Sequence, residues 1–335
     1  MSSAVQVFAR FRPPNAMEVD SERRFGDEDD GIIGYEAVNC VEDHVVQIQS
    51  SGTKTNEFTY NHVFMPGDSQ LSVYRKTVRH LIPGLLKGIN ASVLAYGQSG
   101  SGKTYTMFGN NPSPAVPETV DVDFAAQKGV IPRAMDELFF HIGMSAKENP
   151  SAEYTVNVSF VQIYNEKVTD LFVPEMGNLK VRQNMSGAWF VDCSTVTVLT
   201  TDDVLYQINR GLENRVTKAT GLNDVSSRSH AILSITVEKA DYDDGSQYTG
   251  RIDFVDLAGS ESASKSFATS DRLKEAGFIN KSLMHLRGII TFLGSGKKKN
   301  GKRHLMYRNS CLTKLLYDSL GGNSNSMLML AKCET

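Results

Sequence analysis

The alternation of apolar and polar residues along the chain predicts strands and helices in mixed order. Runs rich in β-branched and aromatic residues predict strands at 5–11, 45–49, 58–60, 91–96, 154–164, 230–237, 248–257 and 327–331. Helical patterns are found at 69–86, 135–142, 201–216 and 273–293, and a last helix is predicted from the capping residue Ser310 to Leu320. The sequence contains no internal repeat and no linker, so we expect a single α/β domain over residues 1–335.

Turn and proline signals separate these elements. Asp241-Tyr-Asp-Asp-Gly245 joins two of the predicted strands and is typical of a β-hairpin turn. The proline-rich segment 110–117 cannot continue a helix, because proline lacks a backbone N–H, so we expect an exposed insertion there. The acidic run at 27–30 predicts a solvated loop. Gly321 and Gly322 are expected to end the last helix.

A glycine-rich motif follows the predicted strand at 91–96. Gly97-Gln-Ser-Gly-Ser-Gly-Lys-Thr104 matches G-x-x-x-x-G-K-[ST] at every position, and a helical pattern begins near Tyr105. Its glycines allow backbone N–H groups to turn toward a β-phosphate, and the helix N-terminus adds partial positive charge. Lys103 is expected to neutralise the β- and γ-phosphate oxygens, and Thr104 to bind Mg²⁺. The motif predicts a nucleoside triphosphate site; a glycine-rich turn with an incidental lysine is the alternative.

Composition narrows the range of partners. The 335 residues carry a net charge of −3, with 40% hydrophobic and 22% charged residues, as in ordinary soluble globular proteins. This balance argues against general nucleic-acid binding, while a local basic patch would still suit an acidic partner. The four cysteines form no Cys-x-x-Cys pair, so neither a zinc site nor a disulfide framework is expected. With no apolar run long enough for a membrane span and no signal peptide, we expect a cytoplasmic protein.

Two further segments carry residues suited to ATP chemistry. Asp256 lies at the end of the strand predicted at 248–257, where its carboxylate would support a metal ion. Gly259 follows and is expected to contact the γ-phosphate through its N–H. Glu261 is expected to orient or deprotonate water. An ordinary strand-ending turn is the alternative for Asp256. Asn223-Asp-Val-Ser-Ser-Arg-Ser-His230 offers donors from five of its eight residues. It is expected to hold Mg²⁺ and γ-phosphate when ATP is bound and to release after hydrolysis, whereas a plain serine-rich loop is the alternative.

Taken together, these motifs resemble the kinesin motor domain. The segments 97–107, 223–230 and 256–261 resemble, in order and spacing, the phosphate loop, switch I and switch II of that family. Flanking matches are Arg10-Phe-Arg-Pro13, Tyr96, Ile163-Tyr-Asn-Glu166, Asn280-Lys-Ser-Leu283 and Asp318-Ser-Leu-Gly-Gly-Asn323. The resemblance covers residues 5–331. It implies a P-loop NTPase-type fold, with a mixed central β-sheet flanked by helices on both faces.

The resemblance also implies an ATPase with ATP and Mg²⁺ as cofactors. Adenine is then expected near Arg10, Pro13 and Tyr105. The implied nucleotide-binding residues are Arg10, Arg12, Pro13, Gly97, Gln98, Ser99, Gly100, Ser101, Gly102, Lys103, Thr104 and Tyr105. The implied residues of the metal site are Thr104, Ser227 and Asp256. Thr104 and Ser227 are expected to coordinate Mg²⁺ directly, and Asp256 to support the site without coordinating the ion itself.

Catalytic roles follow from the same resemblance. The implied catalytic residues are Lys103, Ser226, Arg228, Gly259 and Glu261. Ser226 and Glu261 are expected to position the lytic water, and Gly259 to sense the γ-phosphate. Arg228 and Glu261 are expected to form a salt bridge that closes when ATP is bound, because a pair formed in only one state acts as a latch. A static surface ion pair is the alternative and would contribute little.

A lysine-rich segment follows the helix at 273–293. Residues 297–303 carry five positive charges, usually the mark of a solvated loop. In kinesins, however, this loop and the helices beside it face the acidic microtubule. The implied microtubule-binding residues are Lys265, Lys274, Lys281, Lys297, Lys298, Lys299, Lys302, Arg303, Arg308 and Lys314. Binding is expected to depend strongly on salt.

The chain departs from the family pattern in three places. Cys311 stands where the family usually has a basic residue, and Ser262 and Ala263 replace a basic residue and a valine. The chain also ends before the family's final helix and neck linker, so we expect a catalytic core, with oligomerisation and cargo regions outside it. The start at Met1 resembles N-terminal, plus-end-directed members. The implied location is the microtubule cytoskeleton of the cytoplasm.

Three other functions compete with this interpretation. A GTPase switch would need Asn-Lys-x-Asp, and Asn280-Lys-Ser-Leu283 lacks the Asp. A microtubule-binding module without turnover is disfavoured because Lys103, Thr104, Ser227, Asp256 and Glu261 are all present. A microtubule-depolymerising kinesin is the third alternative and remains open.

Overall fold

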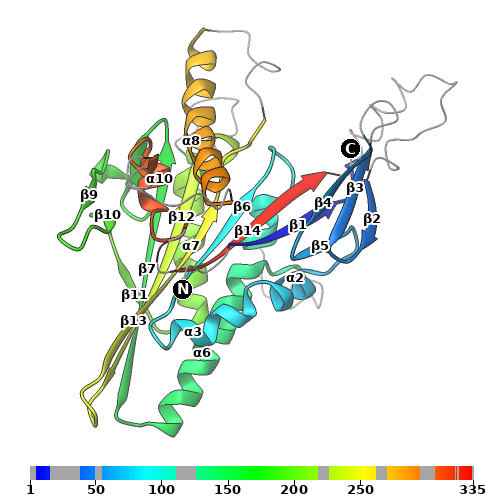
Figure 1. The fold of residues 1–335 in the computed structure, drawn as a ribbon. Coiled ribbons are helices and arrows are strands. Elements are labelled where there is room, and N and C mark those ends of the chain that lie inside the picture. Colours follow the sequence, from blue (N-terminus) through cyan, green and yellow to red (C-terminus); the bar gives the residue numbers. More distant parts are fainter. Residues whose placement is uncertain are drawn as a thin grey trace, which may run out of the picture.

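A mixed β-sheet forms the centre of the molecule (Figure 1). The computed structural model describes residues 5–15, 38–49, 55–110, 126–217, 226–261, 270–294, 306–320, 322 and 324–333. Within these ranges the nine-stranded sheet runs in the order β11 (Val196–Val198), β7 (Ala152–Tyr164), β12 (His230–Asp241), β13 (Gln247–Asp256), β6 (Asn90–Tyr96), β14 (Ser324–Cys333), β1 (Gln6–Arg12) and β5 (His62–Phe64), and β8 (Lys167–Asp170) pairs with β7. Neighbours from β13 to β5 are parallel, and those from β11 to β13 are antiparallel.

Helices cover both faces of this sheet (Figure 1). The first face carries α2 (Gln70–Lys76), α3 (Ile82–Leu85), α4 (Lys103–Phe108), α6 (Val130–Glu148) and α7 (Thr201–Thr217). The opposite face carries α8 (Ser270–Gly294) and α10 (Cys311–Leu315). Strand β7 shows why two cores form: Val158 and Phe160 point into the first core, and Val161 and Ile163 into the second. The predicted mixed sheet with helices on both faces is confirmed.

Smaller elements lie at the margins of the sheet. Strands β2 (Val38–Glu42), β3 (Val45–Gln49) and β4 (Thr55–Thr59) form one antiparallel sheet, and β9 (Val181–Gln183) and β10 (Trp189–Val191) form a hairpin. Short 3₁₀ turns occur at η2 (Arg79–Leu81), η3 (Pro174–Met176) and η4 (Ser226–Arg228). None of the described helices is long and apolar enough to cross a membrane.

The predicted strands are found, with different ends. The hairpin of β12 and β13 is confirmed and is longer than predicted, and the strand predicted at 58–60 begins earlier, as β4. Strands β2, β5 and β8 to β11 were not predicted, because most span only three or four residues and show too little alternation. The expected loops at 27–30 and 111–117 lie outside the described residues.

The single helix predicted at 69–86 is wrong. The Thr77 hydroxyl donates to the Val73 carbonyl, and the Thr77 N–H is shared between two carbonyls at the end of α2. A new helix then starts at Ile82 with Pro83 in its first turn, where the missing N–H costs no helical bond. The chain therefore bends between α2 and α3.

Two other helices differ in length from the predictions. Helix α6 spans Val130–Glu148 and extends beyond the predicted 135–142 at both ends; at its start, Pro132 lies in the first turn, where proline is tolerated. Helix α10 starts after Ser310 as predicted, with Ser310 and Thr313 forming a reciprocal capping box, but it ends at Leu315. Leu316 and Leu320 are nevertheless buried, in the turns that follow.

Candidate active site

The phosphate-loop motif connects β6 to α4. Gly102 has a φ of +96° and is the N-cap of α4, a backbone conformation that residues with a side chain rarely adopt. Gly97 lies against β14, since a Cβ on it would be 2.1 Å from the Ala331 carbonyl oxygen. Lys103 is buried, and its Nζ donates to the carbonyls of Gly97 (3.0 Å) and Gln98 (2.8 Å). The lysine therefore lies against the inside of the loop.

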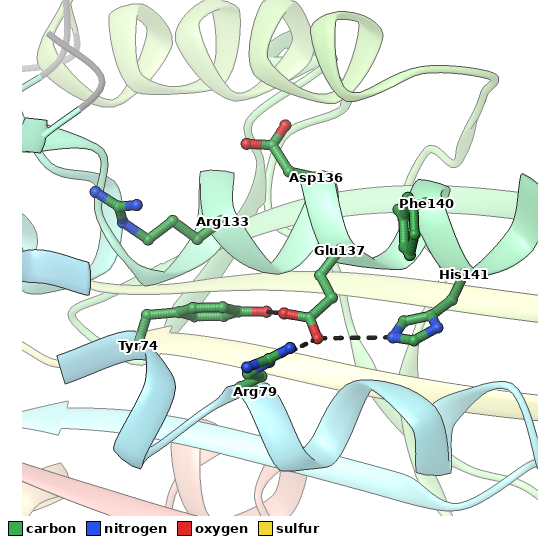
Figure 2. A pocket seen from close by; sticks show the side chains of 7 residues that line it. All are labelled: Tyr74, Arg79, Arg133, Asp136, Glu137, Phe140 and His141. Carbon is green, nitrogen blue, oxygen red and sulfur yellow. Dashed lines mark hydrogen bonds and ion pairs between the residues drawn. The ribbon is translucent and has the colours of Figure 1, made fainter. Parts of the chain in front are cut away.

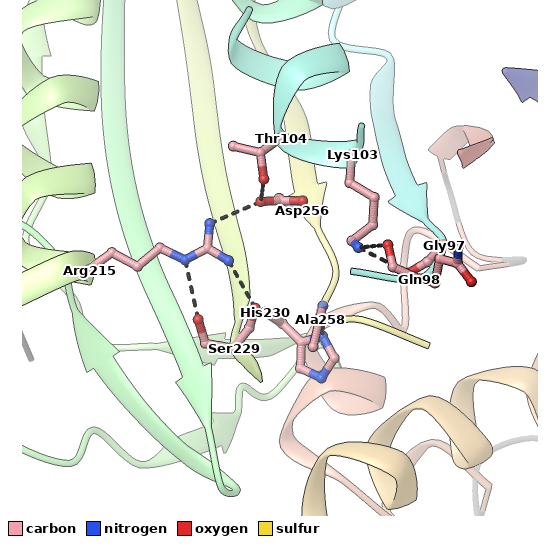
Figure 3. A network of polar contacts seen from close by, with 9 residues as sticks. All are labelled: Gly97, Gln98, Lys103, Thr104, Arg215, Ser229, His230, Asp256 and Ala258. Atoms are coloured by element: carbon pink, nitrogen blue, oxygen red, sulfur yellow. Dashed lines mark hydrogen bonds and ion pairs between the residues drawn. The ribbon is translucent and has the colours of Figure 1, made fainter. Parts of the chain in front are cut away.

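Thr104 and Asp256, both predicted at the metal site, meet behind the loop. The Thr104 hydroxyl donates to Oδ2 of Asp256 at 2.9 Å (Figure 3). The same oxygen accepts from Nη1 of Arg215 at 2.9 Å, and Arg215 also donates to the hydroxyl and carbonyl of Ser229. Both ions are buried, with Arg215 1% and Asp256 2% exposed. Arg215 therefore ties the end of α7 to β13 and to the residue before β12.

The oxygens around Asp256 suit a magnesium ion. Oδ1 of Asp256 is buried and has no hydrogen-bond partner among the described residues. Magnesium prefers carboxylate and hydroxyl oxygens together with water, and a buried carboxylate oxygen without a donor is costly. Thr104 and Asp256 therefore fit the metal that the motif implies. Ser227, the third predicted ligand, lies in η4.

The loop at 256–261, referred to below as the switch loop, is held from two sides. The N–H groups of Leu257 and Ser260 donate to the carbonyls of Ala95 and Gly97, at 3.2 and 3.1 Å. The N–H of Gly259 instead donates to the carbonyl of Ser227 at 2.8 Å. A Cβ on Gly259 would lie 2.4 Å from the Ser99 hydroxyl oxygen and from the Glu261 carboxylate, so a larger residue here would displace these two side chains. The switch loop thus lies between the phosphate loop and the segment before β12.

Glu261 contacts the phosphate loop directly. Its carboxylate accepts from the backbone N–H of Ser99 (2.8 Å) and from the Ser99 hydroxyl (2.5 Å). Burial acts to raise the pKa of Glu261, but the bonds from Ser99, helped by the charge of Lys103, hold it below its ordinary value. Arg228 lies in η4, and its predicted salt bridge with Glu261 in the ATP-bound state stays a prediction.

Two of the residues predicted near adenine, Arg10 and Tyr105, lie next to each other. Arg10, on β1, donates to Gln70 (2.9 Å) and to the Thr106 hydroxyl (2.8 Å), and its guanidinium lies 5.3 Å from the centre of the Tyr105 ring. Arg12 donates to the Gly100 carbonyl at 2.6 Å and also to the carbonyl of Pro13. The end of β1 is therefore fastened to the phosphate loop and to α4.

Two buried residues of this region were missed by the sequence analysis. Arg215 lies in the last turn of a correctly predicted helix, but no motif marks it. His230 was noted only as the end of a motif. Its imidazole is buried, and burial, followed by the charges of Arg215 and Lys103, lowers its pKa to about 3. The ring is therefore neutral.

A separate cavity of about 360 Å³ lies between η2 and α6 (Figure 2). It is lined by Tyr74, Arg79, Arg133, Asp136, Glu137, Phe140 and His141. Glu137 accepts there from the hydroxyl of Tyr74 (2.7 Å) and from Nε of Arg79 (3.0 Å). None of the predicted site residues lines this cavity.

Part of the predicted microtubule surface is described. Lys281 is exposed on α8, Arg308 is exposed before α10, and Nζ of Lys314 lies 5.5 Å from the centre of the Trp189 ring. Cys311, at the departure from the family pattern, donates its N–H to the Glu166 carboxylate at 2.7 Å. The remaining candidates for this surface lie outside the described residues or have side chains that are not described; they are Lys265, Lys274, Lys297, Lys298, Lys299, Lys302 and Arg303. Ser262 and Ala263 also lie outside the described residues, and the side chain of Ser226 is not described.

Comparisons with known proteins agree with this geometry. The kinesin motor domain family matches residues 10–335. The kinesin heavy chain of Gibberella moniliformis is 35% identical over 333 residues, covering 98% of this chain and 33% of that protein. The kinesin-like protein KIN-12B of Oryza sativa subsp. japonica is 37% identical, covering 98% of this chain and 29% of that protein. The chain thus spans about a third of the length of these relatives.

A solved structure shows the same fold. It is described as "Structure of a fast kinesin: Implications for ATPase mechanism and interactions with microtubules". Its TM-score is 0.84 at 34% sequence identity, with 100% of this chain and 87% of that chain covered. The chain belongs to the kinesin motor domain family.

Proposed function

We propose that the chain is a microtubule-stimulated ATPase that drives movement along microtubules, with ATP and Mg²⁺ as its cofactors. The observation that carries the proposal is the meeting of Thr104 and Asp256 behind an intact phosphate loop, with Oδ1 of Asp256 buried and without a donor among the described residues. This is the donor set that a magnesium nucleotide site requires. Membership of the kinesin motor domain family supports the proposal.

The phosphate loop is proposed to bind the triphosphate, with Lys103 turned from the loop carbonyls toward the phosphate oxygens. Mg²⁺, held by Thr104 and Ser227 with Asp256 behind them, would neutralise phosphate charge. Arg10, Pro13 and Tyr105 would hold the adenine, since Arg10 already lies beside the Tyr105 ring. Arg215 would hold the Asp256 carboxylate in place through its hydrogen bond to Oδ2.

Two contacts of the switch loop have to change before the catalytic roles can be filled. The Gly259 N–H is bonded to the Ser227 carbonyl, so sensing the γ-phosphate means exchanging one acceptor for another. The Glu261 carboxylate has to leave Ser99 before it can pair with Arg228 and orient water with Ser226. The acceptors that would be replaced are the Ser227 carbonyl, for the Gly259 N–H, and the Glu261 carboxylate, for the Ser99 N–H. Phosphate oxygens can accept from the same two N–H groups. Arrival of ATP therefore gives a physical reason for the loop to rearrange.

The proposed partner surface lies on the α8 side of the sheet. Helices α8 and α10 pack on the same core, opposite to α6 and α7. Exposed Lys281 and Arg308 lie on this side, and the lysine-rich segment 297–303 follows α8 in the sequence. A basic surface suits the acidic microtubule and would bind it in a salt-dependent manner.

Finer points belong to the same proposal. We take residues 1–335 as one motor domain acting on the cytoplasmic microtubule cytoskeleton, without nucleic acid as a partner. Plus-end-directed movement is the direction that we propose. The competing functions are microtubule depolymerisation and microtubule binding without movement.

The test is steady-state ATP hydrolysis with and without polymerised microtubules, at low and at moderate salt. Strong stimulation that weakens as salt rises is expected. Glu261→Ala serves as the comparison variant and should bind ATP without turning it over. Tight microtubule binding without turnover by the unaltered protein would favour the non-hydrolysing alternative, and shortening of stabilised microtubules would favour depolymerisation. No response to microtubules would contradict the proposed partner.

A further inference from the structure

His230 joins three elements that are far apart in the sequence. It is the first residue of β12 and only 3% exposed. Its Nδ1 accepts from the N–H of Ala258 in the switch loop at 3.0 Å, and its Nε2 lies 2.8 Å from the Ser282 hydroxyl on α8. Figure 3 shows the imidazole beside Ala258. One side chain thus bridges β12, the switch loop and α8.

The two contacts require one form of the ring. A backbone N–H can only donate, so Nδ1 carries no proton. Because the ring is neutral, the proton must be on Nε2, which then donates to the Ser282 hydroxyl oxygen. Replacing the ring by an apolar side chain of similar size would leave a buried N–H and a buried hydroxyl each short of this partner, which is costly.

Each end of this bridge lies next to a residue of the proposed function. Ala258 immediately precedes Gly259, whose N–H bonds the Ser227 carbonyl. Ser282 immediately follows Lys281, an exposed cation of α8. A shift of α8 against the sheet would therefore pull on one of the hydrogen bonds that hold the switch loop, because the imidazole is rigid and closely packed.

We propose that His230 is a positioning residue that couples α8 to the switch loop, so that docking of a microtubule against α8 changes the rate of ATP turnover. The inference rests on the proposed function, since it takes α8 as part of the docking surface and the switch loop as part of the ATPase site. It adds a route between them that consists of two hydrogen bonds to one ring.

Two variants cut the same bond from opposite sides. In His230→Asn the side-chain oxygen takes about the place of Nδ1 and keeps the bond to Ala258, but nothing reaches Ser282. Ser282→Ala removes the other partner. Each should lower the microtubule-stimulated kcat about two- to tenfold, the range that one hydrogen bond corresponds to. The microtubule concentration for half-maximal stimulation should stay within about twofold, because no surface cation is lost.

The double variant separates coupling from loss of stability. His230→Asn combined with Ser282→Ala should be no slower than the slower single variant, because both remove one interaction. Ser92→Ala is the matched control: Ser92 is buried in β6, and its hydroxyl bonds that of Ser326 at 3.0 Å, so it takes no part in the bridge made by His230. It should keep the stimulated kcat of the unaltered protein. Thermal unfolding of all four variants checks that each is folded.

Several outcomes would overturn the inference. These are an unchanged stimulated kcat in both single variants, additive losses in the double variant, or a raised half-maximal microtubule concentration with kcat retained. Nitrogen NMR of histidine-labelled protein gives a readout without activity: a proton on Nδ1 of His230 would also overturn it. Absence of stimulation in the unaltered protein, with the Nε2–H form observed, would instead contradict the proposed function.

Discussion

At the scale of single residues, the ion pair of Arg215 and Asp256 stands out because both partners are buried. Burial makes each charge dependent on the other, since neither has water to replace its partner. Asp256 also accepts a hydrogen bond from Thr104, and Arg215 donates one to Ser229, so loss of the pair would disturb the predicted metal site as well as the fold.

Arg215→Leu is expected to destabilise the protein by about 3–5 kcal/mol, the usual effect of leaving one buried charge unpaired. The matched control is Arg182→Ala. Arg182 and Asp192 are paired at 3.2 Å with side chains 59% and 71% exposed, so its loss should cost less than about 1 kcal/mol. Urea unfolding of both variants measures the difference. Equal effects would mean that the buried pair contributes no more than a surface pair.

His230 makes a second prediction at this scale, concerning pH. Its pKa is about 3 in the folded protein against an ordinary 6.5, so the unfolded chain takes up a proton that the folded chain does not. This contribution to stability is fully present above pH 6.5 and is lost as pH falls toward 3, at about 1.4 kcal/mol per pH unit.

The difference is measured against His230→Asn, which has no such proton. Between about pH 7 and pH 5, the unaltered protein should lose about 2 kcal/mol more unfolding free energy than the variant. Urea titrations at the two pH values provide the comparison. Parallel losses in the two proteins would show that the ring is protonated in the fold or exposed.

At the scale of elements, the packing of α3 on β13 depends on one glycine. A Cβ on Gly250 would lie 2.1 Å from the Leu85 carbonyl oxygen, which is closer than any real contact. Gly250→Ala should therefore force α3 away from the sheet and cost about 1–3 kcal/mol. Gly143→Ala in α6, where a Cβ meets nothing within 4 Å, should be neutral or stabilising. Thermal unfolding compares them, and equal melting temperatures would contradict the expected clash.

The same scale shows what the sequence could and could not predict. The strand at 154–164 was found because its alternation is long, whereas β9 and β10 span three residues each and have no period to read. The end of α2 at Thr77 was not predicted, because it involves a hydrogen bond from the Thr77 side chain to the Val73 carbonyl, which helix propensity does not describe. Residues of the phosphate and switch loops were found through their fixed local spacing.

Arg215 was not predicted as a site residue for a different reason. Its partners Ser229 and Asp256 lie 14 and 41 residues further along the chain, and only the pairing of β12 with β13 brings them to α7. The Lys103 contacts with Gly97 and Gln98, by contrast, are local, but their direction was not predictable from a motif that describes the loop around phosphate. Long-range polar partners are set by topology, which a single sequence gives only through resemblance.

At the scale of the whole molecule, the sheet separates two surfaces with different proposed tasks. The predicted nucleotide residues gather at the ends of β1, β6 and β13, and the described basic residues Lys281, Arg308 and Lys314 lie on or beside α8 and α10. Figure 1 shows α8 and α10 on the side of the sheet opposite to α6. Binding of a partner on one side can be tested separately from the site itself.

Replacing Lys297, Lys298 and Lys299 by alanine is expected to raise the microtubule concentration for half-maximal ATPase stimulation about threefold or more, since each exposed ion pair contributes about 0.2–1 kcal/mol. The salt dependence should become weaker. Lys147→Ala is the control, because Lys147 is exposed at the end of α6 on the opposite side. An equal effect of this control would argue for general charge attraction instead of a docking surface.

The arrangement of β14 has a consequence for how the protein is made. This strand lies between β6 and β1, and its Met327 is paired with Gln6 in parallel register. β1 leaves the ribosome first, but it has no neighbour that attaches it to the sheet until residues 324–333 have been synthesised. During translation we therefore expect the edge of β1 that later pairs with β14 to be exposed. A chaperone that binds apolar strands is expected to bind β1 and β5 at this stage.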